Sequence, residues 1–186
     1  TLLTTTECLL SPNRNGEFSK QEIEEYLSLQ FGLHKVIWLN HGFLEGDDTD
    51  SHIDTLARLC PNTTILYVGC DNPDDVHYSE LKLMECELLQ ATNAQGNRFN
   101  CIKLPFPKPI FDEKGHRLPA TYANFLITNN QVLVPTYGQP DTDNEAIQII
   151  GNVFPEREIK GIDCRSLIKQ HGSLHCITMQ LLKGTL

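Results

Sequence analysis

Short apolar segments alternate with longer amphipathic ones along the whole chain, and this alternation limits the possible folds more than any other feature of the sequence. The clearest helix is predicted over Asp74–Asn93, where Leu81, Met84 and Leu88 recur near helical spacing. Buried strands are predicted at Lys35–Leu39, Ile65–Gly69, Phe99–Leu104 and Val132–Pro135. No linker or low-complexity tract divides the sequence. Because strands that alternate with helices are typical of α/β proteins, we predict a single α/β domain.

Capping and turn residues predict the remaining elements. Ser19 is placed to cap a helix that runs through Leu27, and Asn129-Asn130 is predicted to form a hairpin turn. Further strands are predicted at Thr1–Leu10, Ile53–Leu59, Tyr122–Thr128 and Glu158–Ile162, a helix at Asp143–Val153, a helical turn at Arg165–Gln170 and a loop at Ser11–Gly16. The segment His171–Gln180 is predicted to run from a loop into a final strand.

The composition argues against several classes of partner. The net charge of the 186 residues is −9, which disfavours binding to nucleic-acid backbones or anionic membranes and fits small cationic ligands. No apolar run approaches the roughly 20 residues that span a bilayer. The seven cysteines show no paired spacing and no Cys-x-x-Cys, so free thiols in a reducing, cytoplasmic compartment are predicted. Because the chain opens at Thr1 within a predicted strand, we expect a missing N-terminal segment, and the sequence says nothing about a signal peptide.

An acidic segment, Gly46–Asp54, follows the predicted strand at Lys35–Leu39. If this segment is extended, alternate residues share a face, which would surround His52 with the carboxylates of Asp48, Asp50 and Asp54. Three interpretations remain open from these residues alone: a solvated acidic loop, a cation site, or a catalytic His-x-Asp pair that receives a cationic substrate. The spacing of an EF-hand calcium loop is absent.

Cys176 is the candidate nucleophile. The preceding Gly172-Ser173 would let a substrate come close to the backbone. On a strand, His175 would face the opposite side from Cys176, so it is not expected to act as its base. The alternative is that Cys176 is a small buried apolar residue, as free cysteines often are. That interpretation is assigned to the other cysteines, which are Cys8, Cys60, Cys70, Cys86, Cys101 and Cys164.

Five segments occur in an order that resembles one enzyme family. They are Leu2–Thr5 with Leu9–Asn15, Gly46–Asp54 with its His52-Ile53-Asp54, Thr121–Phe125, Val134–Gly138 and His175–Thr178. Together they resemble the agmatine deiminase and bacterial-type peptidylarginine deiminase family of guanidine-modifying enzymes, over nearly the whole chain. The resemblance implies a partial pentein α/β propeller with about three of its five ββαβ-type modules. It also implies that residues 1–186 form a single partial domain that lacks an N-terminal part, including a carboxylate that grips the guanidinium.

The resemblance also implies roles for three residues. Asp54 would hold the planar guanidinium, and the thiolate of Cys176 would attack its central carbon to form a covalent thiouronium intermediate. His52 would protonate the leaving amine and then activate water. Neither a metal nor an organic cofactor is required. This chemistry would make the chain a hydrolase of C–N bonds in linear amidines. The net charge of −9 and the lack of a clear basic cluster for a substrate carboxylate favour agmatine, with N-carbamoylputrescine and ammonia as products.

Weaker expectations concern the surrounding residues and the substrate. Asp48 is either a contact to the substrate or a solvated acid, and Asn124 either orients the site or is a structural amide. Arg14 either contacts a substrate carboxylate or forms a structural ion pair. The histidines His34, His41, His77, His116 and His171 have no partner pattern and are predicted to lie on the surface or in loops. Peptidylarginine, free arginine, or a non-catalytic cation-binding role remain alternatives to agmatine, and the resemblance also suggests a homodimer.

Overall fold

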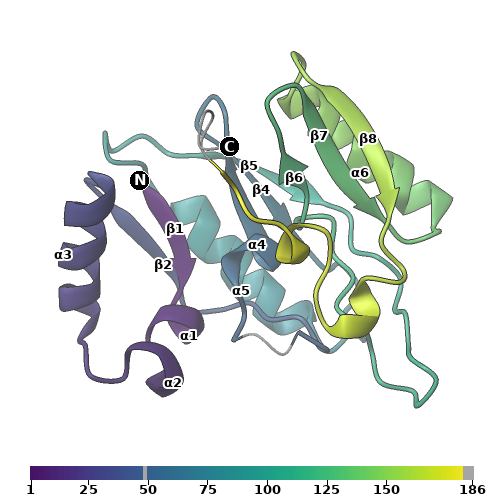
Figure 1. Ribbon diagram of the computed structural model, residues 1–186, viewed down its shortest axis with the longest axis horizontal. Coiled ribbons are helices and arrows are strands. Elements are labelled where there is room, and N and C mark those ends of the chain that lie inside the picture. The colour runs from purple at the N-terminus through teal and green to yellow at the C-terminus, as the bar shows by residue number, and fades with distance from the viewer. Residues whose placement is uncertain (48–49, 182–186) are drawn as a thin grey trace.

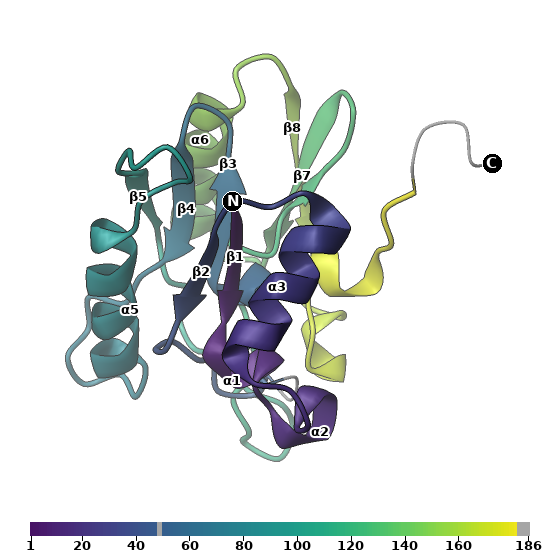
Figure 2. The same cartoon turned by 90° about the vertical axis from the view of Figure 1, so that its left-hand side faces the viewer.

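The first structural unit is a two-stranded parallel sheet covered by a helix. The structure, a computed structural model, describes residues 1–47 and 50–181. Strand β1 (Leu2–Thr5) pairs with β2 (Val36–Leu39), and α3 (Lys20–Phe31) connects them beside the sheet (Figures 1 and 2). Ser19 caps α3 as predicted, because its side chain accepts from the Glu22 backbone and the Glu22 carboxylate accepts from the Ser19 backbone. Two short helices, α1 (Thr6–Leu9) and α2 (Pro12–Asn15), lie between β1 and α3.

The next two units share the order strand, strand, helix, strand. In the first, β3 (Ala57–Cys60) is antiparallel to β4 (Thr64–Val68), which is parallel to β5 (Asn100–Leu104) after α5 (Tyr78–Gln90). In the second, β6 (Leu126–Ile127) is antiparallel to β7 (Gln131–Thr136), which is parallel to β8 (Glu158–Asp163) after α6 (Pro140–Val153). The remaining short helices are α4 (Ile53–Leu56) and the 3₁₀ helices η1 (Ile168–Gln170) and η2 (His175–Ile177). The predicted alternation therefore holds.

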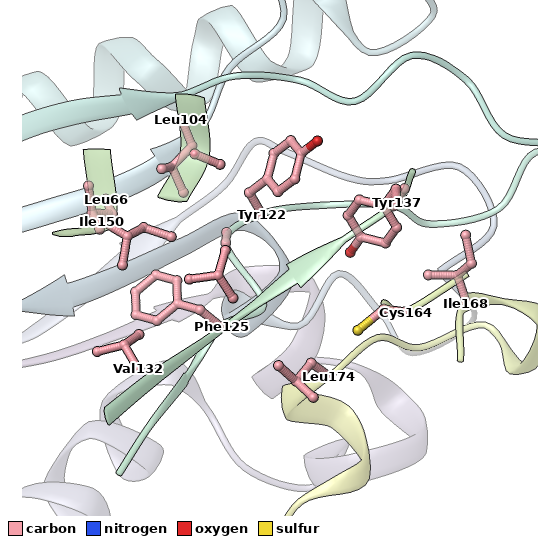
Figure 3. Packing of buried hydrophobic residues seen from close by; sticks show 14 of the residues in the cluster. Leu66, Leu104, Tyr122, Phe125, Val132, Tyr137, Ile150, Cys164, Ile168 and Leu174 are labelled. Carbon is pink, nitrogen blue, oxygen red and sulfur yellow. The ribbon is translucent and has the colours of Figure 1, made fainter. Parts of the chain in front are cut away.

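Strand β4 separates two apolar clusters. All five of its residues are buried, and because successive residues of a strand face opposite sides, Leu66 joins one cluster while its neighbours Ile65 and Tyr67 join the other. The first cluster lies between the last two sheets and includes Tyr122, Phe125 and residues of β7 and α6 (Figure 3). The second lies between β2, β4 and α5. Together the two clusters hold in place the segments that carry the pocket residues described below.

Several predicted boundaries were wrong. The strand predicted over Thr1–Leu10 ends at Thr5, whose hydroxyl caps α1, and a helical turn replaces part of the loop expected at Ser11–Gly16. Residues 53–56 are helical, so the strand predicted at Ile53–Leu59 begins only at Ala57. The strand predicted at Tyr122–Thr128 is reduced to β6. The final strand predicted through Cys176 is a turn of 3₁₀ helix.

Replacing Phe125 with alanine should remove about 3–5 kcal/mol from the free energy of unfolding. Phe125 is fully buried among Leu66, Val132 and Ile150 (Figure 3), and its ring meets that of Phe154 edge-on at 6.0 Å. Urea denaturation measures the change, with Phe111→Ala as the control because Phe111 is 57% exposed. A loss below about 1 kcal/mol for Phe125→Ala would contradict this account of the core.

Candidate active site

Two distant segments line one open pocket, and a third, buried segment contacts both of them. His52 and Asp54 lie at the start of α4, His175 and Cys176 lie in η2, and Asn124 lies in the segment before β6. Figure 1 shows η2, in yellow, beside α4 near the middle of the molecule. The pocket has a volume of about 460 Å³ and is lined by His52, Asp54, Gln170, His171, Gly172, His175, Cys176, Ile177 and Thr178. The structure therefore brings together the predicted nucleophile, imidazole and carboxylate.

The buried amide of Asn124 connects these segments. Its nitrogen donates to the Asp54 carbonyl oxygen at 3.2 Å and to Asp54 Oδ2 at 3.1 Å. Its oxygen accepts from the backbone N–H groups of His175 at 2.8 Å and Cys176 at 3.4 Å, and lies 3.5 Å from the Cys176 sulfur. Asn124 has no exposed surface, so water does not compete for these bonds. Of the two predicted roles, orienting the site fits these contacts.

Asp54 is held as a carboxylate. Its Oδ2 lies 2.7 Å from His175 Nδ1 and 4.0 Å from Cys176 Sγ. Burial alone would raise the pKa of Asp54, but the hydrogen bond and electrostatic attraction from His175, with further attraction from Arg58 and His52, outweigh it, and the net pKa lies below its usual value. An ionised carboxylate beside the thiol is suited to bind a cationic group.

Cys176 carries an exposed side chain on a tight turn. Gly172 packs directly against it, since a Cβ at that position would lie 3.0 Å from the Cβ of Cys176. Desolvation raises the pKa of the thiol, and the charges of Asp54 and Asp47 add to this, whereas hydrogen bonds from Ser173 and with Asn124 lower it. The thiol is therefore not activated by its own surroundings, and a bound cation would offset the negative charges.

His52 is paired with Arg14. Nη2 of Arg14 lies 2.7 Å from His52 Nε2, and Nε of Arg14 lies 3.4 Å from Asp50 Oδ2. Because a guanidinium only donates, His52 Nε2 is an acceptor in this arrangement. Of the two predictions for Arg14, the structural ion pair is confirmed.

The acidic segment is not extended. Asp50 and Ser51 have φ values of 59° and 51°, and α4 begins at Ile53. Asp50 turns towards Arg14 and lines a different pocket from Asp54. The expected shared face was therefore wrong for these residues, and Asp48 lies outside the described residues. Within the described ranges 1–47 and 50–181, no group of three or more His, Cys, Asp or Glu side chains is placed to hold a metal ion.

The structure gives partners to residues that sequence reasoning set aside. His175 shares the pocket with Cys176 and bonds Asp54, because on a 3₁₀ turn adjacent residues need not face opposite sides. The other histidines with partners are His41 with Glu80, His77 with Asp75, His116 with Asp112 and His171 with Gly46. All seven cysteines are free, but Cys86 is exposed, so the buried apolar interpretation was wrong for it.

A buried hydroxyl network supports the turn before Cys176. The Tyr137 hydroxyl accepts from the Thr121 backbone N–H at 3.0 Å, donates to the Thr121 carbonyl at 2.8 Å and lies 2.8 Å from the Ser173 hydroxyl. All three residues are buried. This network ties two of the segments noted in the sequence, Thr121–Phe125 and Val134–Gly138, to the segment that carries the thiol.

Comparison with known proteins gives a consistent result. Residues 1–181 match the model of the Porphyromonas-type peptidyl-arginine deiminases. An agmatine deiminase of Medicago truncatula is 35% identical over 198 residues, which cover 97% of this chain and 53% of the relative. The chain thus spans about half the length of the curated relatives it matches.

Solved structures share the mixed α/β fold. A candidate arginine deiminase from Porphyromonas gingivalis is 49% identical with a TM-score of 0.93, covering 98% of this chain and 53% of that chain. A cysteine-to-serine variant of C. jejuni agmatine deiminase, solved with substrate bound, is 42% identical with a TM-score of 0.86, covering 93% of this chain and 50% of that chain. In the part of this chain that is described, no helix is long and apolar enough to cross a membrane.

Proposed function

Since the chain belongs to the Porphyromonas-type peptidyl-arginine deiminase family, we propose that the protein hydrolyses a guanidinium group, with agmatine as substrate and N-carbamoylputrescine and ammonia as products. The observation that carries this proposal is that Asp54 and Cys176 line one open pocket and are both contacted by the buried amide of Asn124. A carboxylate and a thiol 4.0 Å apart would hold a guanidinium with its central carbon next to the sulfur.

The reaction we propose has two stages. The Cys176 thiol gives its proton to His52, and the thiolate attacks the guanidinium carbon; a C–N bond of the tetrahedral adduct then breaks as the His52 imidazolium passes that proton to the leaving nitrogen, releasing ammonia. The product of this stage is an S-alkylthiouronium on Cys176. His52 then removes a proton from water, which attacks the same carbon; the C–S bond breaks and the hydroxyl proton of the adduct is lost to solvent, which gives the ureido product and the free thiolate. Asp54 holds the guanidinium, and His175 and Asn124 hold Asp54.

The charge of the pocket supports agmatine over arginine-type substrates. Among the described lining residues there is no lysine or arginine, whereas Asp54 contributes a carboxylate. A substrate with a free carboxylate would find no guanidinium or ammonium partner among these side chains. Arg14 lies outside this lining and is already bonded to His52 and Asp50. Peptidylarginine and free arginine are the alternatives that the assay below would detect.

We further propose that the described units belong to a pentein propeller. The two strand-strand-helix-strand units and the β1–α3–β2 unit would form about three of its five modules. The remainder, with a second carboxylate for the guanidinium, would lie outside these 186 residues. The seven free thiols support a reducing, cytoplasmic compartment. A homodimer is part of the same proposal.

A colorimetric assay for ureido products tests the proposed activity. The 186-residue chain and an N-terminally extended polypeptide of family length are incubated with agmatine, arginine and a blocked peptidylarginine. We expect the extended polypeptide to convert agmatine faster than the other two. Faster conversion of arginine or peptidylarginine would overturn the substrate assignment, and no product from any guanidine would overturn the activity.

A further inference from the structure

One histidine of the pocket has no part in the proposed chemistry. His171 lines the same pocket as Cys176, and its chain neighbour Gly172 packs against the thiol-bearing residue. It ends η1 with φ of 67°, in the left-handed region that non-glycine residues seldom adopt. A side chain in such a conformation needs surroundings that hold it there.

The orientation of the His171 ring is fixed by a backbone carbonyl. His171 Nδ1 lies 2.8 Å from the carbonyl oxygen of Gly46. Because a carbonyl oxygen only accepts, Nδ1 carries the proton. In the neutral ring Nε2 of His171 is then a hydrogen-bond acceptor. His171, which carries this nitrogen, lines the pocket.

The backbone around the Gly46 carbonyl is fixed by close contacts with neighbouring residues. Gly46 has a φ of 88°, and a Cβ there would lie 2.3 Å from the Arg117 carbonyl oxygen, so no other residue fits without a shift. The adjacent Glu45 N–H donates to Nε2 of the buried His77 at 2.7 Å. His77 Nδ1 in turn lies 2.6 Å from Asp75 Oδ1, and Arg117 pairs with the same carboxylate at 2.9 Å.

This support is buried and rigid. The side chains of His77, Asp75 and Arg117 are 1%, 7% and 9% exposed. Burial lowers the pKa of His77, which keeps its Nε2 an acceptor for the Glu45 N–H. The carbonyl that orients His171 is therefore fixed by a network outside the reacting site.

We infer that His171 is a specificity residue, whose Nε2 accepts a hydrogen bond from the ammonium tail of the substrate. This inference rests on the proposed function. The described pocket lining offers an ammonium several side-chain acceptors, among them the Asp54 carboxylate, the Gln170 amide oxygen and the His171 imidazole. Asp54 is assigned to the guanidinium, whereas the His171 ring is oriented by a backbone carbonyl and has no other assigned role. His171 is thus the residue that distinguishes a tail bearing an ammonium from an apolar tail.

The test compares agmatine with 1-butylguanidine, which has the same guanidinium and four-carbon chain but no ammonium. His171→Asn suits the left-handed backbone and removes the ring. We expect KM for agmatine to rise about tenfold while KM for 1-butylguanidine stays within about twofold, since a hydrogen bond to a charged group is lost with one substrate only. His171→Gly repeats the test without any side chain. His116→Asn is the control, because His116 is an exposed loop histidine paired with Asp112.

Protection of Cys176 from iodoacetamide, followed by peptide mass spectrometry, measures binding of both ligands without turnover. We expect agmatine to protect at lower concentration than 1-butylguanidine in the wild type, and this advantage to shrink about tenfold in His171→Asn. Equal losses for both ligands, or no agmatine advantage in the wild type, would overturn the role of His171. A third outcome is that His171→Asn removes the stronger protection by agmatine while no guanidine yields a ureido product. That outcome would overturn the proposed activity but support binding of the ammonium tail at His171.

Discussion

Ureido-product formation should fall at least about a thousandfold when Cys176 is replaced by serine. The serine hydroxyl is nearly isosteric with the thiol but ionises far less readily, so no comparable nucleophile remains beside Asp54. The comparison is made in the family-length polypeptide with agmatine. Cys86→Ser is the matched control, because Cys86 is also an exposed free cysteine but lies on α5, away from the pocket.

The Cys176→Ser variant should fold normally. Its side chain is exposed, so the substitution removes little buried apolar surface, and the thermal unfolding midpoint should match that of the wild type. Loss of turnover with an unchanged midpoint therefore reports on chemistry. Turnover within about tenfold of the wild type would exclude Cys176 as the nucleophile.

Replacing Asp54 with asparagine should have two opposite effects. Deimination should fall at least about a hundredfold, because the carboxylate that would hold the guanidinium is lost. The thiol should become more reactive towards iodoacetamide at neutral pH. Desolvation is the largest cause of the raised Cys176 pKa, and the Asp54 charge adds to it, so removing that charge lowers the pKa and increases the thiolate fraction.

Both effects are measured on the same protein samples. The rate of alkylation of the Cys176 peptide is followed by mass spectrometry as a function of pH, beside the ureido assay. Asp50→Asn is the matched control, since Asp50 comes from the same acidic segment but pairs with Arg14. If Asp54→Asn slowed alkylation at neutral pH, the electrostatic account of the pocket would be wrong. If it left turnover unchanged, Asp54 would not hold the substrate.

The sequence predicted the regular elements well wherever local signals and burial agree. The helix cap at Ser19, the helix within Asp74–Asn93 and the strand at Ile65 all appear near their expected positions. Periodicity was informative for these elements because each buries one face or both. It failed at Tyr122–Thr128, where the side chains of Tyr122 and Phe125 are buried by packing between sheets and not by pairing within one.

The sequence identified three residues of the candidate site, but it did not predict how they are arranged. His52, Asp54 and Cys176 were named from their segments, and the structure places all three on one pocket. The contact between Asp54 and His175 spans 121 positions, and no local pattern reports such a contact. Because Cys176 was assigned to a strand, His175 was predicted to face away from it. The two residues instead lie on a 3₁₀ turn, which is held by Asn124 because its side-chain oxygen accepts from the backbone N–H groups of both.

The most direct test of the central claim is a rapid acid quench of the family-length polypeptide during turnover of agmatine, followed by peptide mass spectrometry. The account predicts that the peptide containing Cys176 carries the added mass of agmatine less ammonia, and that Cys176→Ser carries none. An adduct on another residue, or steady turnover without any adduct under conditions that trap half-reacted enzyme, would contradict covalent catalysis by Cys176.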